Sequence, residues 1–326
     1  VLDGRGGRKM EISVDTGNKQ MKTLNETFSS GVYQSDVPPS TGKNADFMRF
    51  NGKYYILTEE RGTYMRDKTK NDRYYWLTLF AIGKELERME ADGRIEYQKD
   101  KTYSLDLLVG LPPAHFGDLK NSFQKYFKRN GENVIFVYHG RSWNIRIQRA
   151  YVFAQGYAAA VTVFADIKVY PKALVIDIGG LTADYIMIRK GAADIHVSDS
   201  LESGVIILYQ KIKKVCMGKF DTLIEESDVD AILQNREKVD EIYDPEIIKT
   251  VKEEARKFVS DFLGSFRELQ IDLKTCYVIF IGGGAMLLRE MIEESDLIKK
   301  HMFIEDVNAN EKGYELLYRA IKASKK

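Results

Sequence analysis

The sequence predicts an α/β protein made of two related domains. Its 326 residues exceed the usual size of one domain, and apolar runs of strand length alternate with amphipathic stretches of helical length. Two apolar strands also end in the same Asp-x-Gly pattern, at Ile12–Gly17 and at Val175–Gly180. Because each of these strands opens one half of the chain, we expect a duplication on the scale of a whole domain.

The first half is predicted to contain several strands and three helices. Met10–Asp15 has the composition of a buried strand, and Asn51-Gly52 lies between two aromatic-rich runs, a pattern typical of a β-hairpin. The expected strands are Met10–Asp15, Phe47–Phe50, Tyr54–Leu57, Tyr103–Val109, Val134–Tyr138 and Trp143–Val152, and the expected helices are Arg73–Asp92, Gly117–Arg129 and Phe153–Phe164.

The second half begins after Tyr170-Pro171 and is richer in helix. Pro245–Leu269 is the longest amphipathic stretch of the chain, with proline at the position that suits the first turn of a helix. The expected strands are Ala173–Ile178, Ala183–Arg189 and Tyr277–Ile281, and the expected helices are Val205–Met217, Pro245–Leu269, Ala285–Glu293 and Glu311–Lys322.

The composition excludes several classes of protein. The formal net charge is +1, with 44% hydrophobic and 30% charged residues, so nothing favours direct nucleic-acid or membrane binding. The two cysteines, Cys216 and Cys276, form no Cys-x-x-Cys motif, which fits a reducing cytoplasm. We interpret Val1–Lys9 as a leader or an artificial extension, with Met10 as the native start.

Each Asp-x-Gly turn carries the chemistry of a phosphate site. The turn directs several backbone N–H groups to one side, and glycine lets a phosphate approach the backbone closely. An aspartate at the strand end can hold Mg²⁺ directly or through water. One such turn is a common hairpin feature, but two matched copies favour a paired site that contains Asp15 and Asp177.

A third segment has the features of a nucleoside site. The strand Tyr277–Ile281 runs into Gly282-Gly283-Gly284 and then into a helix, which exposes backbone at a helix N-terminus. A flexible connection is the alternative interpretation. The pattern is neither the dinucleotide Gly-x-Gly-x-x-Gly motif nor a Walker A loop.

Taken in order, these elements resemble the nucleotide-binding segments of the actin, Hsp70-type chaperone and sugar-kinase superfamily. The resemblance spans nearly the whole chain and implies an actin-like, duplicated ribonuclease-H-like fold, with two domains around a nucleotide cleft. It implies domain I at residues 10–168, domain II at 169–310, and a C-terminal helix at 311–326 that returns to domain I. The matching segments are Asp15–Lys22 and Val175–Asp184 (phosphate loops), Phe153–Ala159 and Asn308–Tyr314 (connecting helices) and Gly282–Leu287 (adenosine segment).

Within that superfamily the chain is most similar to the ParM/StbA plasmid-segregation actins. The similarity rests on Gly179–Asp184, on Asp199-Ser200-Leu201 ahead of Gly204-Val205, and on Ile281–Ala285. The chain departs from some relatives at Gln155, where they carry glutamate. This departure changes the group that positions water and leaves the expected reaction the same.

The resemblance implies a role for each matching residue. Asp15 and Asp177 would order a hydrated Mg²⁺, and Gln155 would orient the attacking water with Asp177 as a weak base; these three are the expected catalytic residues. For Lys22 and Glu202, a solvated side chain is the alternative. The expected nucleotide-binding residues are Asp15, Thr16, Gly17, Asn18, Lys22, Gly179, Gly180, Leu181, Thr182, Asp184, Glu202, Gly204, Gly282, Gly283, Gly284 and Ala285.

The function that the resemblance implies is that of a filament-forming ATPase. It would bind ATP or GTP with Mg²⁺, polymerise with copies of itself, and segregate low-copy plasmid DNA through a ParR-like, DNA-bound adaptor in the bacterial cytoplasm, without a membrane. A non-polymerising ATPase, a small-molecule kinase and a nucleotide-binding scaffold are the alternatives. The presence of Asp15, Asp177 and Gln155 argues against a scaffold that only binds nucleotide. Polymerisation rests on the family resemblance alone, because filament contacts have no local sequence motif.

Overall fold

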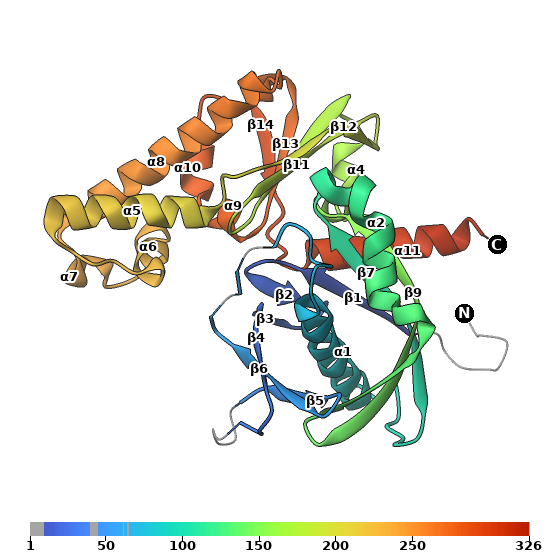
Figure 1. Ribbon diagram of the computed structural model, residues 1–326. Coiled ribbons are helices and arrows are strands. Elements are labelled where there is room, and N and C mark those ends of the chain that lie inside the picture. Colours follow the sequence, from blue (N-terminus) through green and yellow to red (C-terminus); the bar gives the residue numbers. More distant parts are fainter. Residues whose placement is uncertain (1–9, 40–44, 61, 64, 326) are drawn as a thin grey trace. The chain divides into compact units, whose positions relative to one another are not determined.

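The structure, a computed structural model, describes residues 10–39, 45–60, 62–63 and 65–325; the predicted leader at Val1–Lys9 lies outside these residues. The chain divides into two compact units (Figure 1). The first unit comprises the described parts of Val1–Thr162 and Asn308–Lys326, and the second comprises Val163–Val307. The α/β class expected from the sequence is confirmed in both units.

The first unit is built on one mixed sheet. Its central strands β1, β7 and β9 are parallel neighbours, while the strands toward either edge pair in antiparallel fashion. Among the described residues the strand order is β3 (Thr27–Ser29), β2 (Gln20–Lys22), β1 (Met10–Thr16), β7 (Thr102–Leu111), β9 (Arg141–Ala154), β8 (Asn133–Tyr138), β5 (Phe47–Phe50), β6 (Lys53–Thr58) and β4 (Gly31–Ser35).

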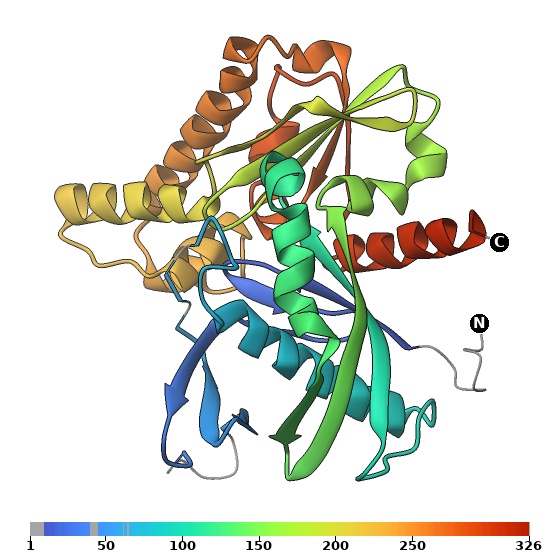
Figure 2. The ribbon, with the colours of Figure 1, turned by 45° about the vertical axis from the view of Figure 1, so that its right-hand side comes forward.

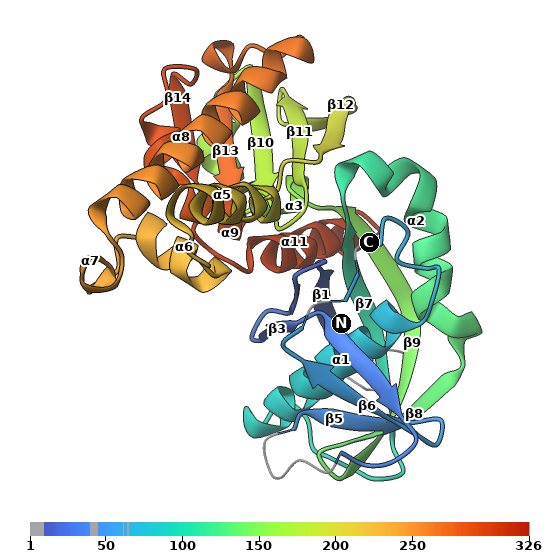
Figure 3. The ribbon, with the colours of Figure 1, turned by 60° about the vertical axis from the view of Figure 1, so that its left-hand side comes forward.

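Helix α1 (Arg73–Ala91) forms the centre of this unit. Nearly every residue in its first half is buried, which is the pattern of a helix covered on all sides. The sheet curves around it (Figure 2), and its side chains join the same hydrophobic core as the strands. The other helices are α2 (Pro113–Lys128), the short α3 (Tyr157–Val161), a 3₁₀ turn at Arg129–Gly131, and α11 (Ala309–Ala323). Figure 3 shows β1 between α1 and α11.

The second unit has a smaller sheet with helices packed against it. The order is β12 (Ala192–Leu201), β11 (Ala183–Arg189), β10 (Lys172–Ile178), β13 (Tyr277–Ile281) and β14 (Lys300–Phe303), with β10, β13 and β14 parallel. The helices are α4 (Phe164–Ile167), α5 (Val205–Phe220), α6 (Glu226–Leu233), α7 (Val239–Ile242), α8 (Pro245–Glu268), α9 (Gly283–Leu287) and α10 (Arg289–Glu293), with a 3₁₀ turn at Leu273–Thr275.

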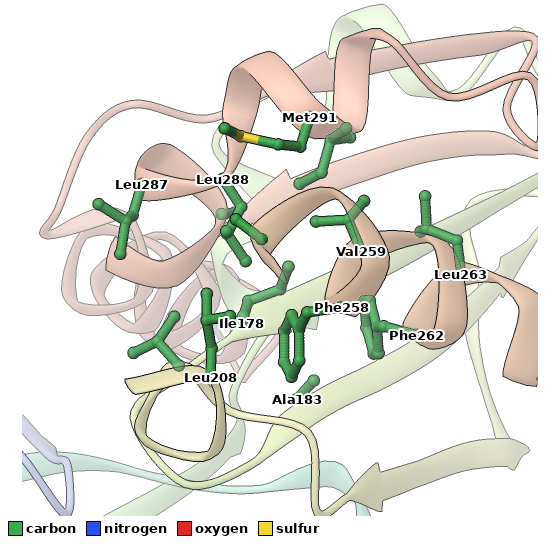
Figure 4. Close-up of a cluster of buried hydrophobic side chains, with 14 of the residues drawn as sticks. Ile178, Ala183, Leu208, Phe258, Val259, Phe262, Leu263, Leu287, Leu288 and Met291 are labelled. Carbon is green, nitrogen blue, oxygen red and sulfur yellow. The ribbon is translucent and has the colours of Figure 1, made fainter. Parts of the chain in front are cut away.

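Helix α8 supplies much of the core of the second unit. Its buried residues recur every three or four positions, so one face is apolar while the opposite face carries charges. Figure 4 shows Phe258 and Phe262 beside Ile178 and Ala183, which flank the β10–β11 turn. The turn is therefore anchored in the core of this unit.

Two predicted helices differ from the structure. Phe153–Phe164 was expected to be one helix, but β9 continues to Ala154, where it pairs with Leu111, and the chain bends at Gly156 (φ 72°) before α3 begins. The expected helix Ala285–Glu293 begins earlier, at Gly283, and is interrupted at Leu288, which separates α9 from α10. In the first segment, strand pairing with β7 overrides the helical preference of the local sequence. In the second, the non-helical backbone of Leu288 (φ −98°, ψ 10°) interrupts a run of good helix formers.

Several short elements were not predicted at all. They are β2, β3, β4, β14, α4 and α7, together with the longer β12 and α6. Most are too short or too polar to show a clear hydrophobic period, and β12 depends on pairing with β11. In the part of the chain that the structure describes, no helix combines the length and hydrophobicity needed to cross a membrane.

Candidate functional site

The first Asp-x-Gly segment forms the turn between β1 and β2. Asp15 lies opposite Lys22 and Thr16 opposite Met21 in the antiparallel ladder, so the predicted tight turn is confirmed. A side chain at Gly17 would overlap the carbonyl oxygen of Gln20, which explains why glycine is needed there. The turn thus leaves its backbone uncovered by a side chain at this position.

Asp15 and Gln155 are brought into direct contact. The Nε2 group of Gln155 donates a hydrogen bond to Oδ1 of Asp15, and both side chains are more than nine-tenths buried. Gly110 makes this possible, because a side chain there would overlap the Tyr314 hydroxyl and lie 2.8 Å from Cγ of Gln155. With Nε2 bonded to Asp15, the side-chain carbonyl oxygen of Gln155 is the atom that can accept a hydrogen bond from a bound water.

Thr16 places a polar atom at the same loop. Its side chain is fully buried, and its Oγ1 has no hydrogen-bond partner among the described residues. A buried hydroxyl without a partner is costly, so its presence indicates a ligand or water that completes its hydrogen bonding. Lys22, directly opposite Asp15 in the ladder, is half-buried.

A lysine from a distant segment, which was not predicted from the sequence, contacts this loop. Lys68 is only 4% exposed, and its ammonium group donates a hydrogen bond to the carbonyl oxygen of Thr16. The Nζ atom also lies 5.1 Å from the centre of the Tyr74 ring, within the range of a cation–π interaction. Lys68 lies in a polar stretch that resembles a solvated loop, so no local signal in the sequence identifies it.

Further side chains fix the conformation of the loop. The Tyr74 hydroxyl donates a 2.7 Å hydrogen bond to Oδ1 of Asn18, and Oγ of Ser30 donates one of 2.6 Å to the Asn18 carbonyl oxygen. Burial raises the pKa of Tyr74, so its hydroxyl stays protonated and can donate at neutral pH. The side chain of Asn18 therefore serves the loop's own structure, while its backbone N–H remains a candidate phosphate donor.

The second Asp-x-Gly segment joins β10 to β11. Asp177 lies opposite Asp184 in the ladder, and the N–H of Gly179 donates a 2.9 Å hydrogen bond to the Thr182 carbonyl. The first residues of α5 are hydrogen-bonded to this turn. The backbone N–H groups of Val205 and Ile206 donate to the carbonyl oxygens of Gly179 and Gly180. The turn is thus hydrogen-bonded to the N-terminus of α5.

The glycine-rich segment contacts this second turn. Gly282 has φ +88°, a conformation that favours glycine, and a side chain there would overlap Oδ1 of Asp177 and lie 2.7 Å from the Ile178 carbonyl oxygen. Gly284 and Ala285 are buried in α9, while the Cβ position of Gly283 meets nothing within 4 Å. The structure therefore brings the predicted adenosine segment beside the predicted phosphate loop of the same unit.

The remaining predicted residues of the second unit lie around this turn. The N–H of buried Gly204 donates a 3.0 Å hydrogen bond to the Leu181 carbonyl, and Oγ of Ser200 donates a hydrogen bond to Asp184. Glu202 is exposed just ahead of α5. No cluster of three or more histidine, cysteine, aspartate or glutamate side chains suited to a metal ion occurs among the described residues.

Two family models match the chain. A model described as the N-terminal domain of actin-like proteins matches residues 13–157, and one described as the C-terminal region of an archaeal, MreB-like actin homologue matches residues 175–294. Together the two matches take in more than half of the 326 residues. The chain belongs to the actin-like proteins. A search of curated protein sequences found no match.

Solved structures of the same fold align over nearly the full chain. The crystal structure of the apo pSK41 ParM protein is 14% identical over 98% of this chain and 99% of that one, with a TM-score of 0.68. An archaeal actin homolog is 16% identical over 96% and 100%, with a TM-score of 0.73. A 15-stranded ParM filament from Clostridium botulinum is 16% identical over 96% and 100%, with a TM-score of 0.70. The predicted actin-like fold and the resemblance to ParM-type proteins are confirmed.

Proposed function

We propose that this chain is an actin-like, Mg²⁺-dependent ATPase that polymerises into nucleotide-dependent filaments. In this proposal the filaments segregate low-copy plasmid DNA in the bacterial cytoplasm through a ParR-like, DNA-bound adaptor. The observation that carries the catalytic part is the buried hydrogen bond between Gln155 and Asp15 at the first phosphate loop. The filament part is supported by similar structures, which include ParM and Alp12 filaments.

The loop of the first unit would bind phosphate mainly through its backbone. The N–H groups near Gly17 and Asn18 supply donors, and the orphaned hydroxyl of Thr16 supplies one more. Lys68 and Lys22 add positive charge, which lowers the cost of bringing a polyphosphate to the loop. Lys68 is the better placed for this role, because its hydrogen bond to Thr16 fixes its ammonium group at the loop.

The loop of the second unit would act on the same nucleotide. The N–H groups of Gly180, Leu181 and Thr182 are its candidate phosphate donors, with Gly179 and Asp184 shaping the turn. The backbone of Gly282–Ala285 would lie against the nucleoside, with Glu202 and Gly204 as further contacts. An archaeal actin homolog of the same fold has been solved as a complex with ADP, which supports nucleotide binding by this arrangement.

Hydrolysis requires an oriented water and compensation for phosphate charge. Gln155, with its Nε2 bonded to Asp15, would present its carbonyl oxygen to the attacking water, and Asp177 would assist as a weak base. Asp15 and Asp177 would hold Mg²⁺ through its water ligands. When bound, the ion neutralises part of the charge on the phosphates.

Right-angle light scattering, followed together with phosphate release after addition of Mg-ATP, tests the proposal. A rise in scattering that decays as phosphate appears is the expected result, and a parallel run with Mg-GTP measures nucleotide preference. Phosphate release with flat scattering would reject the filament and leave a monomeric ATPase or a kinase, for which an acceptor would be sought. Adaptor-dependent segregation is tested separately, by comparing the loss of a plasmid that encodes the unaltered chain with the loss of one that encodes Asp177→Ala.

A further inference from the structure

The backbone that follows Gln155 forms a tight and uncommon turn. Gly156 has φ 72° and ψ −59°, and the N–H of Tyr157 donates a 2.8 Å hydrogen bond to the carbonyl oxygen of Gln155. These values define a γ-turn with a positive φ at its centre, which is a rare and strained conformation. Such strain persists only where neighbouring groups hold it, and it is concentrated at functional sites.

One side chain from the far end of the sequence holds this turn. Oδ1 of Asn310 accepts a 2.9 Å hydrogen bond from the backbone N–H of Gly156, which lies 154 positions earlier in the chain. Gly156 is buried, and a buried N–H needs an acceptor. Asn310 therefore stabilises the backbone conformation directly after Gln155.

The helix that carries Asn310 is packed against the segment on both sides of the turn. Asn310 lies in the first turn of α11. A side chain at Gly313 would overlap the carbonyl oxygen of Ala158, so α11 approaches the backbone of α3 directly. The ring of Tyr314 stacks on that of Phe153, with the ring centres 5.6 Å apart. This packing fixes the place of the Asn310 side chain.

Gln155 is held by its backbone as well as by its side chain. Its N–H donates a 2.9 Å hydrogen bond to the carbonyl oxygen of Leu111, at the end of β7, and its Nε2 donates to Asp15. All of these residues, with Asn310, belong to the first unit. Since the γ-turn fixes the chain on the C-terminal side of Gln155, release of that turn would let the amide leave Asp15.

We propose that Asn310 is a positioning residue for Gln155, which it aligns by holding the γ-turn at Gly156. This inference rests on the proposed hydrolysis at the site. The role requires an acceptor oxygen at position 310 and no proton transfer by that side chain. Loss of the acceptor leaves the backbone phosphate donors in place and slows the step for which Gln155 orients water.

Three variants at one position test the need for an acceptor. Asn310→Ala and Asn310→Leu remove it, and Leu also fills the space of the lost side chain. Each is expected to slow single-turnover phosphate release roughly ten- to a hundredfold, with little change in ATP affinity. Asn310→Asp keeps an acceptor oxygen and suits the first turn of a helix, so it should restore most of the rate. Equal slowing by all three variants would overturn the proposal.

A double variant tests whether Asn310 acts through Gln155. In a chain that already carries Gln155→Ala, Asn310→Ala should slow phosphate release no further, because residues that act as a unit have non-additive effects. Leu316→Ala changes a residue of the same helix that is 42% exposed, and this control should behave as the unaltered chain. A further loss in the double variant, as large as that of Asn310→Ala alone, would contradict the positioning role.

A measurement without nucleotide separates this inference from the proposed function. In an isotope-labelled chain, the side-chain amide resonances of Gln155, assigned by their loss in Gln155→Ala, report its bond to Asp15. We expect Asn310→Ala and Asn310→Leu to shift these resonances and to speed hydrogen exchange of the Gly156 amide about tenfold or more, and Asn310→Asp to change neither. If the unaltered chain hydrolysed no ATP, the proposed function would fail while these spectra still decided the positioning role. Unchanged resonances and exchange in a folded variant without the acceptor would overturn it.

Discussion

The side-chain amide of Gln155 donates a hydrogen bond to the carboxylate of Asp15, from 140 positions away along the chain. Asp15 lies at the end of β1, and Gln155 directly follows β9, with β7 between the two strands. The amide must therefore reach across β7, and it does so where Gly110 has no side chain. Three separate segments thus fix one candidate catalytic contact.

Replacement of Gln155 by alanine tests this contact. Gln155→Ala is expected to slow phosphate release about a hundredfold while nucleotide affinity changes little, because in the proposed mechanism the lost carbonyl oxygen orients water and does not bind phosphate. Single-turnover phosphate release and titration with a fluorescent ATP analogue measure the two effects. Gln210→Ala, at an exposed position on α5, is the control. Comparable losses of binding and release would show that Gln155 is structural.

Replacement of Lys68 tests the lysine that only the structure identifies. Lys68→Met keeps the length of the buried side chain but removes the ammonium group bonded to Thr16. We expect nucleotide affinity to fall by roughly ten- to a hundredfold, the range for loss of a charged hydrogen bond. Lys70→Met changes an exposed lysine two positions away and should bind normally. If the two variants bound nucleotide with similar affinity, Lys68 would contribute to stability alone. Thermal melting would then show a lower melting temperature for Lys68→Met.

The two Asp-x-Gly turns could be predicted because their information is local. An aspartate at the end of an apolar strand, followed by glycine, defines both the turn and its chemistry within six residues, as in Ile12–Gly17. Helix α8 was equally predictable, since its apolar period persists over 24 residues from Pro245. In both cases the residues that form the feature are neighbours in the sequence.

Lys68 and the strand Ala192–Leu201 could not be predicted for the opposite reason. Lys68 contacts the carbonyl oxygen of Thr16, 52 positions away in the sequence, and is buried because its segment folds over that residue. The strand β12 forms by pairing with β11, and half of its own residues are polar. The start of the predicted helix Phe153–Phe164 was likewise decided by pairing with β7. Such features depend on partners distant in the sequence, which a local pattern does not contain.

The core of the second unit offers a test of stability. Phe266 on α8 is fully buried and makes edge-to-face contacts with Tyr185 and Phe262, with ring centres 5.3 and 5.4 Å apart. Phe266→Ala is expected to lower the free energy of unfolding of this unit by about 3–5 kcal/mol, because a cavity replaces the ring. Leu223→Ala is the control, since Leu223 is 85% exposed. Urea denaturation measures both, and equal effects would contradict the packing described.

Substitution of two adjacent glycines distinguishes the effect of backbone strain from the effect of an added methyl group. Gly282→Ala places a methyl group at φ +88° and against Oδ1 of Asp177, so we expect weakened nucleotide binding and a lower melting temperature. Gly283→Ala places the same methyl group where no protein atom lies within 4 Å and should leave the melting temperature nearly unchanged. Nucleotide titration and thermal melting provide the comparison. If Gly283→Ala were the more damaging change, the assigned conformation of this segment would be wrong.

Asp177 is the residue on which hydrolysis is expected to depend most in the second unit. Asp177→Ala should retain part of the nucleotide affinity, because the backbone donors of Gly180–Thr182 remain. Phosphate release should fall at least about a hundredfold, because the proposed magnesium-ordering carboxylate and weak base is lost. Asp240→Asn, exposed at α7, is the control and should behave as the unaltered chain. In the unaltered chain, chelation of Mg²⁺ should reduce turnover to the level of Asp177→Ala. Turnover by Asp177→Ala equal to that of the unaltered chain would reject the second phosphate loop as a catalytic element.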